Sequence, residues 1–182
     1  MIFTEPTIDK FRILIIVTNP ENILLEQYDF IHNYSSIACM TIEYTVVDDL
    51  LCLEKALKSY YTTFNLVYFI GHGDEEGTVI GNSIEPFQWT EIIKIINKSD
   101  TITNDCLFFI HSCYSYNSFD YILKNCIRVK SLVGFKRDTN NIYGYTSFFM
   151  FIFYIVFKGK SYKEAVEIIN NTAYEDLHFL EK

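Results

Sequence analysis

Five short apolar segments, separated by longer amphipathic stretches, dominate the hydrophobic pattern of this chain. Residues 11–17 (FRILIIV), 65–70 (NLVYFI) and 106–111 (CLFFIH) are almost continuously apolar, which is typical of strands buried on both faces. Residues 41–47 (TIEYTVV) alternate between apolar and polar side chains, so we expect an edge strand with one face in water. Residues 131–135 (SLVGF) complete a set of five predicted strands.

The stretches between these strands carry the spacing and the boundary residues of helices. Asp48 and Asp49 are typical helix-start residues, and Ser161 and Glu164 have the spacing of a capping box. Gly159 suits the C-terminal cap of the helix before it. We expect helices from about residue 21, from 50 to 60, from 86 to 96, from 119 to 126, from 145 to 157 and from 162 to 173.

Strands that alternate with helices predict an α/β fold with a mainly parallel sheet covered on both faces. Right-handed crossovers and an edge position for the second strand predict the strand order 2-1-3-4-5. We expect one domain over residues 1–182, because that length suits one core and no repeat or linker-like stretch interrupts it. The carboxyl ends of the third and fourth strands then meet at the edge where open α/β sheets place their sites.

Two tripeptides follow those strand ends. Gly71-His72-Gly73 comes after the third strand, and Ser112-Cys113-Tyr114 comes after the fourth. A cysteine attacks as a thiolate, and a histidine within hydrogen-bond reach can take the thiol proton and later protonate a leaving amine. The backbone amides of Gly73 and Cys113 are candidates for an oxyanion hole. No carboxylate is obviously placed to orient His72, so the pattern predicts a His72/Cys113 dyad.

Each of these residues also has a simpler interpretation. A single cysteine at a strand end is usually a packing residue, and a single histidine there is often an ordinary loop residue. His111 lies two residues before Cys113, so strand periodicity places both on one face and, with His72, suggests a weak zinc-site alternative. We interpret His111 instead as a core residue or a wall of the substrate pocket. We expect no metal and no cofactor, and the P-loop, GxGxxG and GxSxG patterns are absent.

Composition and charge narrow the class of protein. Hydrophobic residues make up 49% and aromatic residues 17% of the chain, so we expect a folded globule. With a net charge of -8, the chain lacks the excess of basic residues that is typical of a nucleic-acid-binding protein. The longest apolar run, residues 148–157, is too short to span a bilayer, so we expect no membrane contact. An odd number of cysteines, without CxxC or a signal peptide, indicates free thiols in the cytoplasm; they are Cys39, Cys52, Cys106, Cys113 and Cys126.

The segments VYFIGHGDEEG and LFFIHSCYSYN resemble the histidine and cysteine segments of caspase-like (clan CD) cysteine peptidases, the CHAT group in particular. The resemblance covers about residues 11–173 and implies a caspase-like three-layer α/β/α sandwich. Where members of the family often have alanine before the long helix, this chain has Thr146 or Ser147. The later part of the chain agrees with the family through Val133-Gly134-Phe135, Phe153-Tyr154, Gly159, Ser161 and Ala165.

The resemblance implies a cysteine endopeptidase that acts on a protein substrate. Cys113 is then the nucleophile, His72 the general base or acid, and Gly73 the donor of an oxyanion-hole amide. Family members serve in regulated cleavage and in bacterial conflict systems, so we expect a role in antiviral defence. Many CHAT peptidases are fused to sensor or scaffold repeats, and this chain has no room for them. We therefore expect either a separate activating or sensor protein as partner, or a complete domain that is inactive until it is bound.

The sequence leaves substrate selection open. The acidic run Asp74-Glu75-Glu76 and Asp138 suit a Lys or Arg in the substrate, whereas Lys136 and Arg137 suit an Asp or Glu. We slightly favour a basic residue in the substrate, and we keep His111 as a further candidate contact with the substrate.

Two other hypotheses stay open beside the peptidase. One is a catalytically silent caspase-like module that binds a partner, although the intact His72 and Cys113 argue against silence. The other is a flavodoxin-like or receiver-like ligand-binding domain, which has the same sheet order. The receiver version needs acidic residues after the first strand, where this chain has Thr18-Asn19-Pro20.

Overall fold

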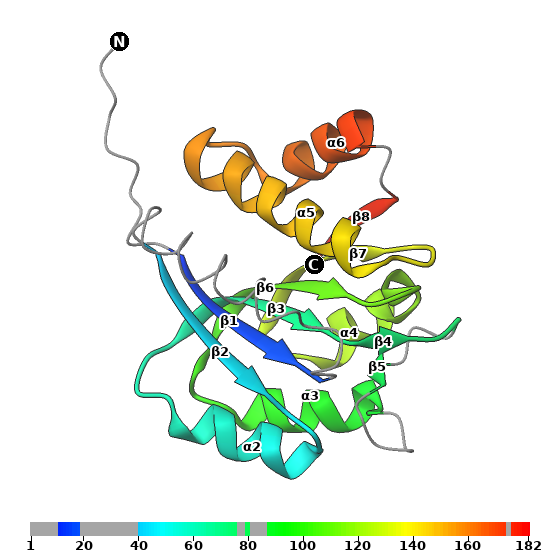
Figure 1. The fold of residues 1–182 in the computed structure, drawn as a ribbon. Helices are drawn as coiled ribbons and strands as arrows, with labels where there is room; N and C mark the ends of the chain where they lie inside the picture. The colour runs from blue at the N-terminus through cyan, green and yellow to red at the C-terminus, as the bar shows by residue number, and fades with distance from the viewer. Residues whose placement is uncertain (1–10, 19–39, 76–78, 81–86, 174–175) are drawn as a thin grey trace.

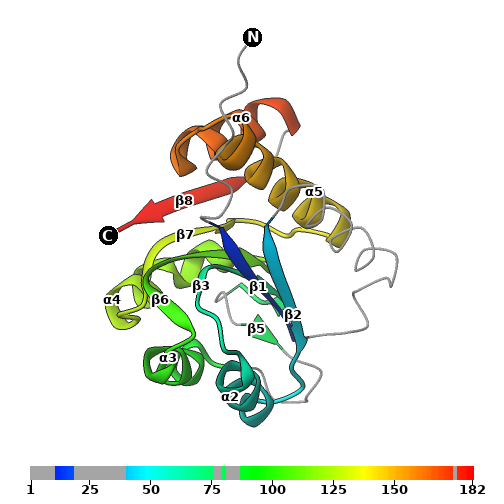
Figure 2. The same cartoon turned by 90° about the vertical axis from the view of Figure 1, so that its left-hand side faces the viewer.

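The computed structural model describes residues 11–18, 40–75, 79–80, 87–173 and 176–182, which contain a six-stranded sheet flanked by helices (Figure 1, Figure 2). The helix predicted from about residue 21 lies outside the described residues, as do Cys39, Glu76 and Pro86. Five strands correspond to the predicted apolar segments: β1 (Arg12–Val17), β2 (Thr41–Val46), β3 (Phe64–Ile70), β6 (Ile102–His111) and β7 (Val129–Phe135).

A sixth strand, β8 (Leu177–Glu181), makes the strand order differ from the predicted one. The order is β2-β1-β3-β6-β7-β8, in which β8 runs antiparallel to β7 and the other neighbours are parallel. β8 escaped prediction because it is short and only its first residue, Leu177, is fully buried. β2 lies at the opposite edge of the sheet, as its alternating pattern predicted.

The described helices correspond to the helical segments predicted from the sequence, but two of them differ in their bounds. The helix predicted over 86–96 begins at Trp89, and the one predicted over 145–157 begins at Asn141. The long apolar helix changes to a π-helical turn, η4 (Phe153–Phe157), instead of continuing as an α-helix to Phe157. The α-helices are α2 (Leu50–Ser59), α3 (Trp89–Lys98), α4 (Phe119–Asn125), α5 (Asn141–Ile152) and α6 (Tyr162–Ala173).

The predicted helix starts at Asp49 and Ser161 are confirmed by their capping contacts. The Asp49 side chain accepts a hydrogen bond from the Cys52 amide at 2.6 Å, which satisfies one of the free N–H groups at the start of α2. Glu164 accepts from the Ser161 amide at 2.9 Å and donates its own amide to the Ser161 hydroxyl at 3.3 Å. These two bonds form the capping box of α6. Gly159 has a φ of +62°, a left-handed conformation that favours glycine.

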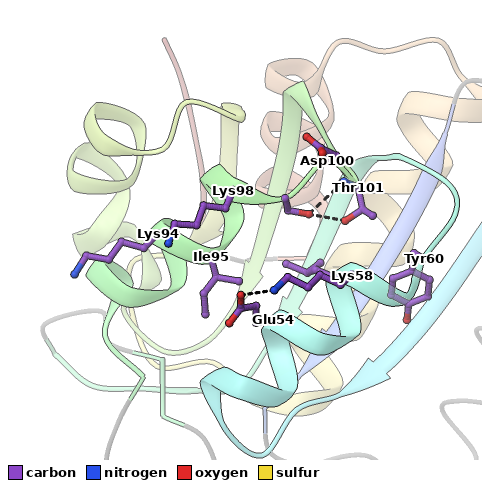
Figure 3. A pocket seen from close by; sticks show the side chains of 10 residues that line it. Glu54, Lys58, Tyr60, Lys94, Ile95, Lys98, Asp100 and Thr101 are labelled. Carbon is purple, nitrogen blue, oxygen red and sulfur yellow. Dashed lines mark hydrogen bonds and ion pairs between the residues drawn. The ribbon is translucent and has the colours of Figure 1, made fainter.

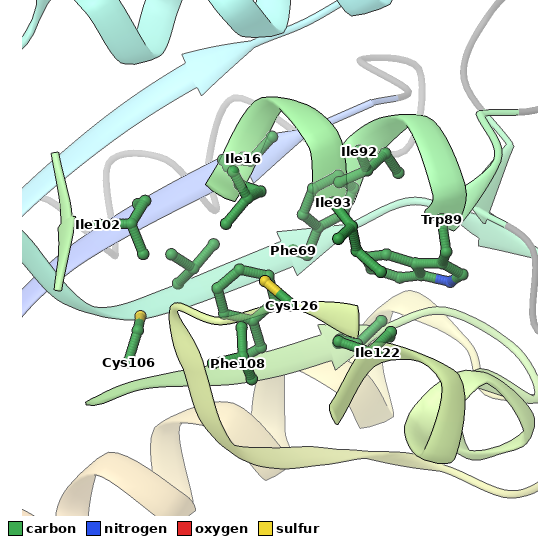
Figure 4. Packing of buried hydrophobic residues seen from close by; sticks show 14 of the residues in the cluster. Ile16, Phe69, Trp89, Ile92, Ile93, Ile102, Cys106, Phe108, Ile122 and Cys126 are labelled. Carbon is green, nitrogen blue, oxygen red and sulfur yellow. The ribbon is translucent and has the colours of Figure 1, made fainter. Parts of the chain in front are cut away.

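Helices cover both faces of the sheet, so two hydrophobic cores lie on either side of it. In Figure 1 and Figure 2, α2, α3 and α4 pack on one face, while α5 and α6 pack on the other. Figure 4 shows the first core, where Trp89 and Ile92 of α3 meet Phe69 of β3 and Phe108 of β6. The second core contains Tyr68. Because strand side chains alternate in direction, β3 and β6 supply both cores and are held from both sides.

Two further observations concern the whole described chain. Within these residues, no helix combines the length and the apolar character needed to cross a bilayer. The four cysteines that the structure describes, Cys52, Cys106, Cys113 and Cys126, are all free thiols.

Candidate active site

The ends of β3 and β6 bring the two predicted tripeptides to one edge of the sheet. Ile70 is the register partner of His111, and the Gly71 amide donates to the His111 carbonyl oxygen at 3.1 Å. Figure 1 shows the arrowheads of β3 and β6 pointing to the same side, where β4 (His72–Gly73) continues beyond the sheet. Strand ends held by two cores therefore position the segments that carry His72 and Cys113.

Gly73 lies directly against the backbone of Cys113. A Cβ atom built on Gly73 would overlap the carbonyl oxygen of Cys113 and would lie 3.1 Å from the Cys113 backbone nitrogen. Only a residue without a side chain allows this approach without displacement. The structure therefore brings together the two residues whose amides the sequence analysis selected for an oxyanion hole.

His72 lies in the short strand β4. β4 pairs antiparallel with β5 (Val79–Ile80), with His72 opposite Ile80 and Gly73 opposite Val79. The side chain of His72 is exposed. The two-residue ladder gives the backbone of this segment a defined conformation, and through Gly73 the segment lies against the backbone of Cys113.

A tight turn follows Cys113. Tyr114 has a φ of 52°, the one positive φ of a non-glycine residue that the described chain contains. The turn continues into a 3₁₀ helix, η3 (Ser115–Ser118), and the Asn117 amide donates to the Tyr114 carbonyl oxygen at 2.9 Å. A left-handed tyrosine is uncommon and is kept only where surrounding contacts impose it.

Ser115 supplies such contacts from below the turn. Its buried hydroxyl accepts a hydrogen bond from the Phe135 amide at 2.9 Å and lies 3.2 Å from the carbonyl oxygen of Ile110. A Cβ on Gly134 would lie 2.5 Å from this hydroxyl oxygen, so Gly134 leaves the space that Ser115 occupies. The Cys113 turn is thus joined to the end of β7.

The thiol of Cys113 is engaged by the backbone of Thr139, in the segment between β7 and α5. The Sγ atom donates to the Thr139 carbonyl oxygen at 3.4 Å and accepts from the Thr139 amide at 3.4 Å. Burial raises the pKa of this thiol, the Thr139 contact opposes that shift, and the negative charge of Asp138 adds to it. The described site therefore holds Cys113 as a neutral thiol.

His111 is a core residue and not a wall of the site. It is 3% exposed; its Nδ1 accepts from the Tyr68 hydroxyl at 2.9 Å, and its Nε2 donates to the Asn140 carbonyl oxygen at 3.3 Å. The face of its ring fills the space beside Gly144, where a Cβ would overlap the imidazole. Burial lowers the pKa of His111 to about 4, so the ring is neutral. The prediction that His111 contacts substrate is therefore not supported by its position.

Acidic residues border the Cys113 turn. Asp138 accepts a hydrogen bond from the Tyr114 hydroxyl at 3.5 Å. The negative charge of Asp138 is the main cause that raises the pKa of Tyr114, and burial and the charge of Glu75 add to it. The Asn117 side chain donates to the Glu75 carbonyl oxygen at 2.7 Å and so fixes the segment after β4. Asp74 precedes Glu75 and is half-buried.

The two basic residues of the same region have other partners. Lys136 lies over the ring of Tyr116, 5.8 Å from its centroid, and Arg137 forms an ion pair with Asp176 at 3.2 Å. Asp176 also accepts from His178 at 2.9 Å, and the His178 ring packs on Tyr116. Sequence reasoning missed this group because it depends on β8, which was not predicted. It also missed Thr139, whose contact with Cys113 is made by the backbone.

Other parts of the described chain have fewer residues arranged for catalysis or metal binding. No group of three or more His, Cys, Asp or Glu side chains in it is arranged to hold a metal ion, and His111 is already committed to Tyr68 and Asn140. A cavity of about 370 Å³ lies between α2 and α3, at the opposite end of β6 from Cys113 (Figure 3). Its described lining contains no histidine or cysteine: Glu54, Leu57, Lys58, Tyr60, Lys94, Ile95, Lys98, Ser99, Asp100 and Thr101.

Comparison with known proteins does not assign a function to this site. No protein-family model matches the sequence, and no curated protein is significantly similar to it.

Proposed function

We propose that this chain is a cysteine endopeptidase of the caspase-like (CHAT) type, with Cys113 as nucleophile and His72 as its base. The observation that carries the proposal is the contact between Gly73 and the Cys113 backbone, at the ends of two neighbouring parallel strands. A caspase-like three-layer α/β/α sandwich is part of the same proposal. The helices on both faces of the mostly parallel sheet support it.

The proposed reaction is acyl transfer through Cys113. His72 accepts the thiol proton, and the sulfur attacks the carbonyl carbon of the scissile peptide bond. The amides of Gly73 and Cys113 donate to the oxyanion that forms. His72 returns the proton to the leaving amine as the C–N bond breaks, which leaves a thioester on Cys113. Water, deprotonated by His72, then hydrolyses this thioester and regenerates the thiol.

We further propose that the protein substrate presents a basic side chain near the cleavage site. Asp138 and Glu75 surround Tyr114 with negative charge, whereas Lys136 and Arg137 are occupied by Tyr116 and Asp176. Asp74, next to Glu75 on the β4 side, is a further candidate contact. Opposite charge favours Lys or Arg over Asp or Glu in the substrate.

The test measures cleavage of a synthetic peptide library by mass spectrometry. Wild type should cut peptides, preferentially beside Lys or Arg, and Cys113→Ala and His72→Ala should each lose the cleavage. Cys52→Ala is the matched control, because Cys52 is a partly exposed cysteine on α2. Cleavage by Cys113→Ala at the wild-type rate would remove the nucleophile assignment, and preferred cutting beside Asp or Glu would remove the charge assignment alone.

A second candidate function is a catalytically silent caspase-like module that binds a protein partner. The observation that favours it is the neutral Cys113 thiol, held by both backbone groups of Thr139. A peptide carrying an electrophilic ketone in place of the scissile bond separates the two functions. The peptidase forms a covalent adduct on Cys113, detected by mass spectrometry, and the silent module does not.

A further inference from the structure

Each residue of the segment 136–140, between β7 and α5, has a contact with another part of the chain near Cys113 or β8. The Lys136 amide donates to the Asp176 carbonyl oxygen at 3.3 Å, and the Arg137 carbonyl oxygen accepts from the Tyr114 amide at 3.2 Å. Asp138 accepts from the Tyr114 hydroxyl, and Asn140 accepts from His111 through its carbonyl oxygen. These contacts attach both ends of the segment, and its middle, next to the Cys113 turn.

The contact of Thr139 with Cys113 engages both the proton and the sulfur of the thiol. The sulfur accepts the Thr139 amide proton and donates its own proton to the Thr139 carbonyl oxygen, both at 3.4 Å. A thiolate has no proton to donate, so the described arrangement suits only the neutral thiol. A nucleophile that must transfer its proton to a base has to leave this arrangement first.

The outer end of the segment is fastened to β8 by an ion pair. Arg137 and Asp176 lie 3.2 Å apart, and the second carboxylate oxygen of Asp176 accepts from His178 at 2.9 Å. β8 is the antiparallel strand at the edge of the sheet, next to β7. A protein that binds this edge can therefore reach the fastening without contacting Cys113.

We propose that residues 136–140 form an autoinhibitory clasp, in which the Arg137–Asp176 ion pair favours the closed form that keeps Cys113 in its Thr139 contact and so lowers the fraction of reactive thiol severalfold. The inference deepens the proposed peptidase function and rests on it, because it specifies how a partner would activate the same cysteine. Opening of the clasp frees the sulfur to turn from Thr139 and give its proton to His72.

The size of the effect follows from the exposure of the ion pair. The Arg137 side chain is 82% exposed, so solvent screens its attraction to Asp176. Loss of such a pair shifts an open–closed equilibrium by up to about fivefold, the equivalent of about 1 kcal/mol. Reaction of Cys113 with an alkylating agent that attacks only the open form should accelerate by the same factor.

The experiment follows alkylation of Cys113 by iodoacetamide at pH 7.5, with each cysteine-containing peptide quantified by mass spectrometry. The variants are Arg137→Ala and Asp176→Asn, which break the ion pair from either side. Lys130→Ala is the matched control, because the Lys130–Glu181 ion pair at 3.3 Å joins the same two strands at their other end. Thermal denaturation of each variant checks that the fold is retained.

The clasp predicts that Arg137→Ala and Asp176→Asn react severalfold faster at Cys113, while Lys130→Ala reacts at the wild-type rate. Equal rates in all four proteins would overturn it, and so would an equal acceleration by Lys130→Ala, which would indicate general loosening of β8. The readout needs no peptidase activity. Faster alkylation without any peptide cleavage would thus support the clasp and count against the proposed function, and cleavage with unchanged alkylation would do the reverse.

Discussion

Replacement of Gly73 by alanine tests the contact on which the proposed function depends. The added methyl group would overlap the Cys113 carbonyl oxygen and lie 3.1 Å from the Cys113 backbone nitrogen and carbonyl carbon. Ordinary contacts between such atoms are about 3.5–4.0 Å, and the overlap with the carbonyl oxygen is the closest of these contacts, so β4 and the Cys113 turn must separate by on the order of 1–1.5 Å. Overpacking of this kind costs about 1–3 kcal/mol of stability, while a displacement of about 1 Å at a reacting centre lowers rates by roughly a hundredfold.

The assay combines peptide cleavage with thermal denaturation. Gly159→Ala is the control, because Gly159 has a left-handed φ of +62° and open space around it. Alanine there should cost about 1–2 kcal/mol of stability and leave cleavage unchanged. Gly73→Ala should lose cleavage by roughly two orders of magnitude at a comparable loss of stability. If Gly73→Ala cleaves as fast as wild type, the two amides do not form an oxyanion hole and the proposed mechanism fails.

Two further predictions concern protonation. Asp138→Asn should lower the pH at which Cys113 becomes a thiolate, because the Asp138 carboxylate adds to burial in raising the pKa of Cys113. The rate of Cys113 alkylation, measured against pH, detects this change. An unchanged midpoint of that pH profile would contradict the prediction. The free energy of unfolding should fall as the pH drops from about 6.5 to about 4, because the unfolded imidazole of His111 binds a proton that the buried ring, with its pKa lowered to about 4, does not. Urea titrations across this range measure the loss, and an equal loss in His111→Gln would show that another group causes it.

The parts of the fold that the sequence predicted correctly are those with continuous or strictly periodic apolar patterns. β1 and β3 are buried along almost their whole length, so nearly every residue of each strand contributed to the signal. β6 begins earlier than predicted, because its first residues, Ile102–Asp105, include partly exposed and exposed polar side chains that hide the strand pattern. β8 shows the same limit more strongly, since packing against β7 and not its own pattern makes it a strand.

The candidate site, like the fold, was predicted from the sequence only where a pattern of side chains marks the residues. His72 and Cys113 were found because each follows a buried strand, and parallel neighbours bring their ends together. His111 was placed on the Cys113 side by its two-residue spacing. However, β6 ends at His111, and the turn at Tyr114 directs the following residues away from the strand geometry. Thr139 acts through backbone atoms that every residue has, so no pattern of side chains reveals it.

The parallel pairing of β3 with β6 also bears on how the protein forms. A parallel pair requires a long crossover, and here the whole of α3 lies between the two strands. Closure of such a loop is an entropic cost that precedes any gain from the pairing, so this contact belongs to the slow, non-local part of folding. A chain still emerging from the ribosome therefore carries Gly73 well before Cys113 can dock against it. The cysteine meets its neighbours only once the central sheet is built, so the proposed peptidase would assemble its site only in the finished chain.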